Sequence, residues 1–198
     1  MKKKTAKKEN FFYKNYKLCW KFLKETKNYI WFSVFLFFLF AVIGFIFPTF
    51  FKQQIFDYIL GITLKLKDYS AIQLIGFIFF NNLKASFFAI VLGIALGVIP
   101  IIFTVTNGYL LGFVARYSVS ENGFLVLWRI LPHGIFELPA VLMSIGIGLK
   151  LGASFFKKNK KKTFKSKFIE SIRFFVFVIF PLLLIAAIIE GILVFYLK

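Results

Sequence analysis

The sequence predicts an all-α protein, a polytopic integral membrane bundle of about five transmembrane helices with a broken or short middle element. Three observations predict this class: the chain of 198 residues is 60% hydrophobic, only 17% of it is charged, and its mean hydropathy is +0.81. A soluble domain is about 45–50% apolar and about a quarter charged, so this composition argues against a water-soluble enzyme. The single Cys excludes a disulfide within the chain.

The formal net charge of +18 is concentrated in two basic blocks. The first precedes the first apolar stretch and comprises Lys2, Lys3, Lys4, Lys7, Lys8, Lys14, Lys17, Lys21, Lys24 and Lys27. The second surrounds one loop and comprises Lys150, Lys157, Lys158, Lys160, Lys161, Lys162, Lys165, Lys167 and Arg173. Lysine-rich segments beside spans stay cytoplasmic, so both blocks are expected on the cytoplasmic side of the cell membrane. Nucleic-acid binding would instead need a basic face on a folded soluble module, and we expect no nucleic-acid partner.

Residues 1–27 are predicted to form a cytoplasmic basic tail with an amphipathic juxtamembrane helix, and residues 28–198 the transmembrane domain. Lysines recur at helical spacing on one side of this helix. The opposite side carries Phe12, Tyr16, Cys19 and Leu23. This pattern is typical of a helix that lies on an anionic leaflet, either as a plain anchor of the first span or as a specific lipid or partner site. Cys19 is expected to be a buried thiol, with palmitoylation as the alternative.

Residues 28–51 carry no charge and form the first predicted span, which crosses from inside to outside. No small-residue cleavage site follows the apolar run, so the segment is expected to stay in the membrane instead of being removed as a signal peptide. Residues 52–80 mix charged and apolar side chains. They predict an external amphipathic helix, or two short ones, on the outer interface.

The next charge-free stretch, Ala85 to Ala115, is too long for one span and short for two. It predicts a second span near Ala85–Phe103, a break near Thr104–Asn107 and a shorter third span to about Ser120. A break at this depth would mark a packed interior or a cavity, because unpaired backbone groups must face protein or water. Alternatively, the second span ends at the surface and Asn107-Gly108 is an ordinary turn. The third segment is then a full span or a re-entrant element.

Residues 135–151 form the fourth predicted span and residues 168–196 the fifth, in which Pro181 is expected to introduce a kink. Four crossings between the two basic blocks place both blocks on one side of the membrane. The charge pattern and the crossing count therefore agree, and Lys198 is expected outside.

Three ionisable residues, His133, Glu137 and Glu190, lie inside apolar stretches. Charge inside a bilayer is costly, so they are expected to form a proton or ion relay, a polar clamp between spans, or simply satisfied hydrogen bonds. His133 and Glu137 are four residues apart and share a helix face, which suits a buried hydrogen bond or two metal ligands. A catalytic zinc ion needs three protein ligands and the chain holds one His, so we expect no metal.

The sequence contains no motif of nucleophilic or nucleotide chemistry, neither a G-x-S-x-G elbow nor a P-loop. Ser144 lies seven residues after Glu137, but serines in membrane helices are commonly packing residues. We therefore expect no catalytic residue, no cofactor and no enzymatic activity.

Small residues recur at every fourth position of the second predicted span, and the spacing is repeated in the third. They are Ala85, Ala89, Gly93 and Gly97, followed by Gly108 and Gly112. Such stripes let helix backbones approach closely. The expected partner is another helix of the same chain, and the alternatives are a homodimer seam or a different membrane protein.

Several short motifs appear in the order found in a known membrane family. They are NNLKASFF at 81–88, the glycine-rich segment ending at Pro100, TNGYLLG at 106–112, LPHGIFELPA at 131–140 and AAIIEG at 186–191. In these motifs the chain resembles the stage II sporulation protein M family, from about Lys27 to the C-terminus. The resemblance implies a five-span membrane protein with a cytoplasmic N-terminus. It also implies the polar motif positions Asn81, Asn82, Asn107, Gly108, Pro132, His133, Gly134, Glu137 and Glu190.

The resemblance further implies a scaffold role. In spore formers the family member recruits and localises peptidoglycan-remodelling enzymes and does none of the chemistry, so the expected partners are other membrane or membrane-associated proteins, with a homo-oligomer as a further option. The alternative is a small transporter or channel component in which His133, Glu137 and Glu190 line a polar path. A third hypothesis, an intramembrane hydrolase that uses His133 and Glu137, has the least support.

Overall fold

The computed structural model describes residues 10–129, 131–156 and 160–196, and every regular element within them is a helix. The α-helices are α1 (Phe11–Ile46), α2 (Lys52–Leu66), α3 (Ala71–Val91), α4 (Val98–Asn122), α5 (Leu131–Ala153), α6 (Lys160–Phe174) and α7 (Phe180–Tyr196). The shorter elements are 3₁₀ turns at Leu92–Ile94, Phe124–Arg129 and Ser154–Phe156 and a π-helical turn at Phe175–Ile179. Five helical stretches of the described chain are long and apolar enough to cross a membrane. The predicted class, an all-α membrane bundle with five spans, is confirmed.

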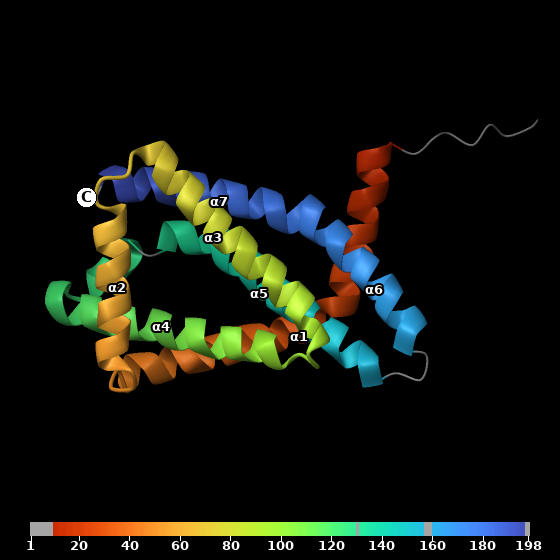
Figure 1. The fold of residues 1–198 in the computed structure, drawn as a ribbon, viewed down its shortest axis with the longest axis horizontal. Helices are drawn as coiled ribbons and strands as arrows, with labels where there is room; N and C mark the ends of the chain where they lie inside the picture. The colour runs from red at the N-terminus through yellow and green to blue at the C-terminus, as the bar shows by residue number, and fades with distance from the viewer. Residues whose placement is uncertain (1–9, 130, 157–159, 197–198) are drawn as a thin grey trace, which may run out of the picture.

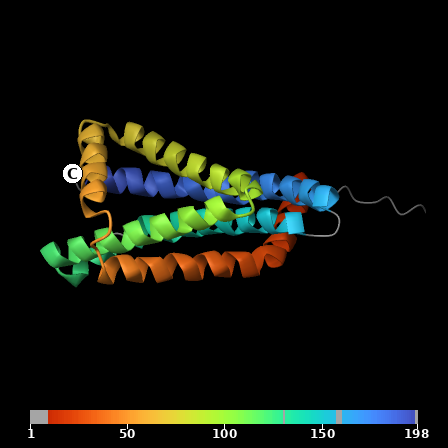
Figure 2. The same cartoon turned by 60° about the horizontal axis from the view of Figure 1, so that its bottom comes forward.

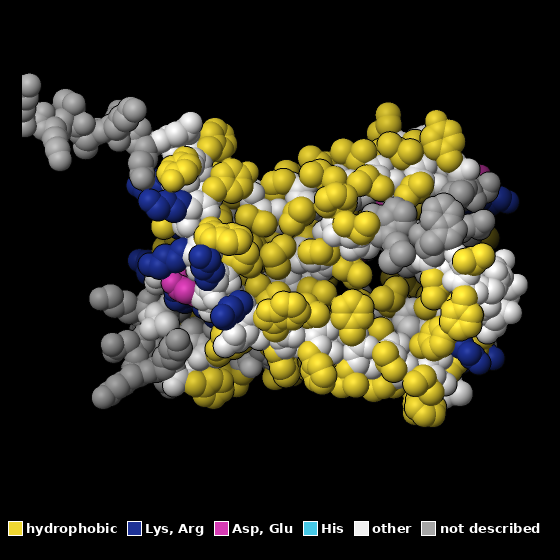
Figure 3. Space-filling view, turned by 180° about the vertical axis from the view of Figure 1, so that it is seen from behind, with side chains coloured by type: hydrophobic (Ala, Val, Ile, Leu, Met, Phe, Trp, Pro, Cys, Tyr) yellow, Lys and Arg dark blue, Asp and Glu magenta, His cyan; other side chains and the backbone are white. Residues whose placement is uncertain are grey.

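The spans run between two ends of the bundle (Figures 1 and 2). α1 begins at the same end of the bundle at which α5 ends and α6 begins. We call it the lysine-rich end, because lysine and arginine side chains gather there in Figure 3. α2 crosses the opposite end, which we call the α2 end. A hydrogen bond of 2.7 Å from Lys167 of α6 to Glu25 of α1 joins the two basic blocks at the lysine-rich end. The even number of crossings predicted between the blocks is confirmed.

α1 is one helix of 36 residues that changes direction along its length (Figure 1). Its first part lies across the lysine-rich end and the remainder forms the first span, so the predicted boundary after residue 27 falls inside a helix. The described lysines of the first part are exposed, whereas Cys19 and Thr26 are buried against the bundle. Phe12 and Tyr16, which were expected on the apolar side with Cys19, remain largely exposed.

The external segment is shorter than the predicted 52–80, because a new helix begins directly after Ser70. Ser70 and Gln73 form a capping box, in which Gln73 Oε1 accepts from the Ser70 N–H at 2.9 Å and Ser70 Oγ accepts from the Gln73 N–H at 3.4 Å. The second span is therefore α3 with its 3₁₀ extension, and the predicted span at 85–103 is wrong. Lys84 lies exposed within α3. One lysine does not end a span, because its long apolar stem lets the ammonium group reach towards the interface.

The predicted break near Thr104–Asn107 is also wrong, both as a break and as an ordinary turn. The chain instead reverses between α3 and α4 at Leu96 and Gly97, whose φ angles are 53° and 78°. Glycine adopts this left-handed conformation without steric cost. α4 then continues through Asn107 as a full-length helix. The amide of Asn107 does not interrupt it, because Nδ2 donates to the carbonyl of Phe103 at 2.7 Å within the same helix.

The last two spans begin earlier than predicted. α5 begins at Leu131 instead of residue 135, and α6 continues through the π-helical turn into α7. The distortion expected at Pro181 takes the form of that π-helical turn, in which the Phe180 N–H bonds to the carbonyl of Phe175. Proline has no N–H to donate to the carbonyl four residues earlier, and a wider turn accommodates this loss.

The predicted stripe of small residues is only partly a packing surface. Ala89 and Gly93 face α5, where a Cβ added to Gly93 would lie 2.6 Å from the carbonyl carbon of Gly148. Ala85 is exposed. Gly97 belongs to the chain reversal instead of the helix, but it is buried and also lies against α5, where a Cβ added to Gly97 would lie 3.3 Å from Leu149 Cδ2. The stripe therefore narrows to three residues, and their partner is a helix of the same chain.

The glycines of α4 lie against α1. A Cβ added to Gly108 would lie 3.2 Å from the carbonyl carbon of Phe37, and one added to Gly112 would lie 2.8 Å from the carbonyl carbon of Ala41. The neighbouring atoms are backbone atoms, so α1 and α4 approach each other closely. Membrane helices gain van der Waals contact in this way without a hydrophobic driving force.

Candidate functional site

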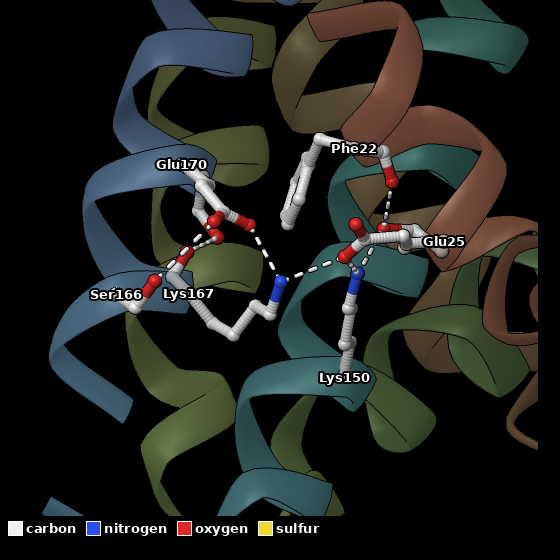
Figure 4. A network of polar contacts seen from close by, with 8 residues as sticks. Phe22, Glu25, Lys150, Ser166, Lys167 and Glu170 are labelled. Carbon is white, nitrogen blue, oxygen red and sulfur yellow. Dashed lines mark hydrogen bonds and ion pairs between the residues drawn. The ribbon is translucent and has the colours of Figure 1, made fainter. Parts of the chain in front are cut away.

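A partly buried polar cluster joins α1, α5 and α6 at the lysine-rich end (Figure 4). Lys150 of α5 donates from Nζ to Thr26 Oγ1 at 2.9 Å and lies 3.6 Å from Glu25 Oε2. Its side chain is only 10% exposed, and its Nζ lies 4.2 Å from the centre of the Phe22 ring. Within the described chain, Lys150 is therefore a buried ammonium group with one hydrogen bond, a looser ion pair and a cation–π contact.

Lys167 of α6 links the two carboxylates of this cluster. Its Nζ donates to Glu25 Oε2 at 2.7 Å and to Glu170 Oε2 at 2.8 Å, and Figure 4 shows the side chain pointing between them. Ser166 donates to the other oxygen of Glu170 at 3.3 Å. The cluster thus holds two ammonium groups and two carboxylates. Paired charges with additional hydrogen bonds are the form in which ions tolerate burial.

Two adjoining cavities lie beside the cluster. The polar cavity has a volume of about 270 Å³ and is lined by Glu25, Tyr29, Lys150, Ser154, Thr163 and Lys167. The apolar side cavity has a volume of about 390 Å³, and its lining includes Tyr29, Phe32, Leu149 and Phe156. Tyr29 borders both cavities, so a polar compartment and an apolar one meet at this side chain.

The sequence pattern places Lys150 and Lys167 in the second basic block and does not predict this cluster. A signal was present, because Glu25 is the one acidic residue among the lysines of 10–27 and Glu170 the one among those of 150–173. A single acid within a lysine-rich segment indicates a position where a charge is paired.

A second polar feature lies between the first turns of α5 and the last turns of α7. The carboxyl groups of Glu137 and Glu190 come close to each other there. Glu190 Oε2 is buried and has no hydrogen-bond partner among the described side chains. His133 lies one helical turn before Glu137 on α5, but its side chain lies outside the described part of the structure.

The other predicted polar positions are distributed over the spans. Asn81 is exposed and Asn82 half-buried on α3, and Gly134 is half-buried near the beginning of α5. The side chain of Pro132 lies outside the described part. Ser144 is buried and donates to a carbonyl of its own helix at 2.8 Å. Among the described side chains, no three of His, Cys, Asp and Glu lie close enough together to hold a metal ion.

An apolar surface occupies the α2 end. A cavity of about 590 Å³ lies between α1, α2 and α4, and its lining includes Phe40, Ile43, Ile55, Tyr109 and Leu110. No residue of α2 is buried, and Tyr58 and Leu64 are 59% and 63% exposed. α2 therefore presents apolar side chains that the described chain does not cover.

The hydroxyl of Tyr109 holds the connection between α1 and α2. It accepts from the Phe50 N–H at 3.1 Å and donates to the carbonyl of Phe47 at 2.9 Å, with the carbonyl of Phe50 at 3.1 Å as a second acceptor. One side chain of α4 thereby satisfies backbone groups that the end of α1 leaves unpaired.

A comparison with known protein families identifies the family of this chain. The family model of stage II sporulation protein M matches residues 33–194 of the chain. The chain belongs to the stage II sporulation protein M family. No curated protein and no solved structure matches it significantly. In this member of the family, the matched region includes the Glu137–Glu190 pair, Lys150 and Lys167. Glu25 precedes that region, so the polar cluster combines residues from inside and outside it.

Proposed function

We propose that this multi-pass membrane protein is a scaffold of the stage II sporulation protein M type, which recruits or localises partner proteins at the cell membrane and performs no chemistry itself. In a spore former the partners would be peptidoglycan-remodelling enzymes, as the resemblance implies. The observation that carries the proposal is the uncovered α2 end. A 15-residue helix without a buried residue lies there beside an apolar cavity, and exposed apolar surfaces of this kind mark interaction sites.

The proposal orients the molecule with its lysine-rich end in the cytoplasm. The exposed lysines and the exposed Trp20 of α1 would then rest on the anionic inner leaflet. α2 would lie on the outer side of the membrane, where wall-remodelling enzymes act. In intact cells, a membrane-impermeant maleimide should label a cysteine placed at Tyr58 and leave one placed at Lys14 unlabelled. The opposite labelling pattern would refute this orientation.

Site-specific photocrosslinking tests the recruiting role. A photoreactive residue at Tyr58 or Leu64 should give one defined protein adduct in native membranes, identified by mass spectrometry. The matched control is Phe35, which is 63% exposed on the membrane-spanning part of α1 and should give lipid adducts. An adduct of twice the chain mass would identify a second copy as the partner. Lipid adducts alone at all three positions would count against a scaffold that works through α2.

The carboxyl pair favours one alternative, a proton-linked transporter or channel component. Glu137 and Glu190 lie close to each other within membrane-spanning helices, and intramembrane acids of this kind occur in proton relays. Proteoliposomes with the wild-type protein and with Glu137→Gln distinguish the two functions. A proton or ion flux that this substitution abolishes would replace the scaffold-only proposal. Equal background flux in both preparations would leave the pair with a purely structural role.

A further inference from the structure

We propose that the polar cavity at the lysine-rich end binds the phosphate group of an anionic phospholipid, with part of an acyl chain in the apolar side cavity. The inference rests on the orientation proposed above, which brings this end to an anionic leaflet. It does not require a protein partner. Refuting the recruiting role would therefore not refute this inference, and refuting this inference would not refute the recruiting role.

The two ammonium groups of the polar cavity converge on a single anionic oxygen. Glu25 Oε2 lies 2.7 Å from Lys167 Nζ and 3.6 Å from Lys150 Nζ. The side chain of Glu25 is 39% exposed, whereas that of Lys150 is 10% exposed. Glu25 can therefore turn towards solvent, while Lys150 stays in place. A phosphate oxygen entering between the two lysines would take the position that the Glu25 carboxylate now holds.

Lys150 retains unused donor capacity for such an oxygen. An ammonium group has three donors. In the described chain one of them bonds to Thr26, and the distance to Glu25 is too long for a second hydrogen bond. Charge-assisted hydrogen bonds from buried ammonium groups to phosphate are among the stronger polar contacts in proteins. An anion that approached Lys150 Nζ more closely than Glu25 does would accept a hydrogen bond from one of its unused N–H donors.

Hydroxyl groups and a helix beginning complete the lining. Thr163 and Tyr29 border the polar cavity and supply hydroxyl groups to its lining. Thr163 lies in the first turn of the 15-residue α6, where the helix dipole favours an anion. The exposed lysines of α1 add positive charge at the same end, which Figure 3 shows.

The dimensions and the neighbouring cavity favour a lipid over a free anion. At about 30 Å³ per water molecule, a cavity of 270 Å³ admits a group much larger than one water. Beyond Tyr29, the apolar side cavity of 390 Å³ offers Phe32, Leu149 and Phe156 to a hydrocarbon chain. A polar cavity and an apolar one that share Tyr29 as a lining residue have the two-part chemistry of a phospholipid.

The experiment measures ligand affinity of the purified full-length chain in detergent by native mass spectrometry and by thermal shift. The three ligands are dioleoyl phosphatidylglycerol, dioleoylglycerol with the same acyl chains, and inorganic phosphate. We expect phosphatidylglycerol to bind most tightly and to raise the melting temperature. Equal binding of dioleoylglycerol would overturn phosphate recognition. Inorganic phosphate that binds as tightly as the phospholipid would overturn the lipid as the ligand.

Variants locate the binding. Lys150→Met keeps the length of the side chain and should weaken phosphatidylglycerol binding about tenfold or more, as expected for a lost charge-assisted contact. Lys14→Met removes an exposed charge of α1 far from the cavity and should stay within about twofold of wild type. Equal losses of phosphatidylglycerol affinity in both variants would indicate general attraction of the lipid to a positively charged surface. That result would overturn the cavity as the binding site. If Lys150→Met does not fold, Thr163→Val is measured in its place. An unchanged phosphatidylglycerol affinity of Thr163→Val would overturn the proposal.

Glu25→Gln separates an anion site from a structural ion pair. If Glu25 holds the position of the phosphate, neutralising it should strengthen phosphatidylglycerol binding about three- to tenfold, because the lipid no longer competes with a carboxylate. If the ion pair only fastens α1 to α6, the same substitution should lower the melting temperature and leave lipid affinity equal or weaker. An equal or weaker affinity would overturn the proposal.

Discussion

Replacement of Gly112 by Ala should loosen the crossing of α1 and α4. The added Cβ would lie 2.8 Å from the carbonyl carbon of Ala41 and 2.8 Å from the backbone nitrogen of Phe45, and it would also press on the carbonyl oxygen of Ala41. All three are backbone atoms, so a change of rotamer cannot relieve the contact and the helices must separate. Overpacking of this kind typically costs about 1–3 kcal/mol.

Gly76→Ala in α3 is the matched control, because a Cβ at Gly76 meets nothing within 4 Å. Ala is favoured over Gly within a helix by roughly 1 kcal/mol at both positions, so helix propensity cancels in the comparison. We expect the free energy of unfolding of Gly112→Ala to lie about 1–3 kcal/mol below that of Gly76→Ala. Steric trapping in bicelles measures this difference. Equal stabilities would refute the inference that backbone contact at Gly112 holds α1 against α4.

Three further predictions concern single polar or small groups. Ser33 Oγ lies 2.8 Å from the carbonyl of Ile30 in its own helix and 3.0 Å from the carbonyl of Leu142 on α5, and its single proton serves both acceptors. Ser33→Ala should therefore cost at most about 0.6 kcal/mol. Ser86→Ala should be neutral or stabilising, because its buried hydroxyl has no partner in the described chain. The reverse order in the same unfolding assay would contradict both assignments. Tyr109→Phe should speed hydrogen exchange of the backbone amides between α1 and α2, measured by mass spectrometry, and unchanged exchange there would show that its hydroxyl does not hold this connection. Gly93→Leu should lower thermostability in detergent, and a variant with wild-type stability would argue against tight packing of α3 on α5.

The class of the protein and the number of its crossings follow from the sequence alone. A segment of about 20 apolar residues prefers hydrocarbon to water whatever it packs against, so each span can be recognised by itself. The same local reasoning identified Glu137 and Glu190 as exceptional, because a carboxyl group inside an apolar run needs a partner wherever the run lies. They come close to each other on α5 and α7, two helices that the sequence does not place side by side.

The residues at which the spans begin and end depend on interactions that a local sequence pattern does not show. The predicted second span began at Ala85, directly after Lys84, but a lysine whose ammonium group reaches the interface can remain within a helix. Asn107 suggested a break, but its amide is satisfied by the preceding turn of its own helix. The reversal occurs at Leu96 and Gly97, in a stretch that carries no charge and reads as a continuous span.

The sequence by itself determined that this chain has five segments long and apolar enough to cross a membrane, with its two basic blocks at the same end, because transfer of a side chain from water to lipid depends on that side chain. Only the tertiary structure decided which charges meet. Lys150, Glu25 and Lys167 come from three helices, and each resembles an ordinary charged residue beside a span. The energy of an ion pair depends on distance in space and on burial, and both quantities exist only after the helices have packed.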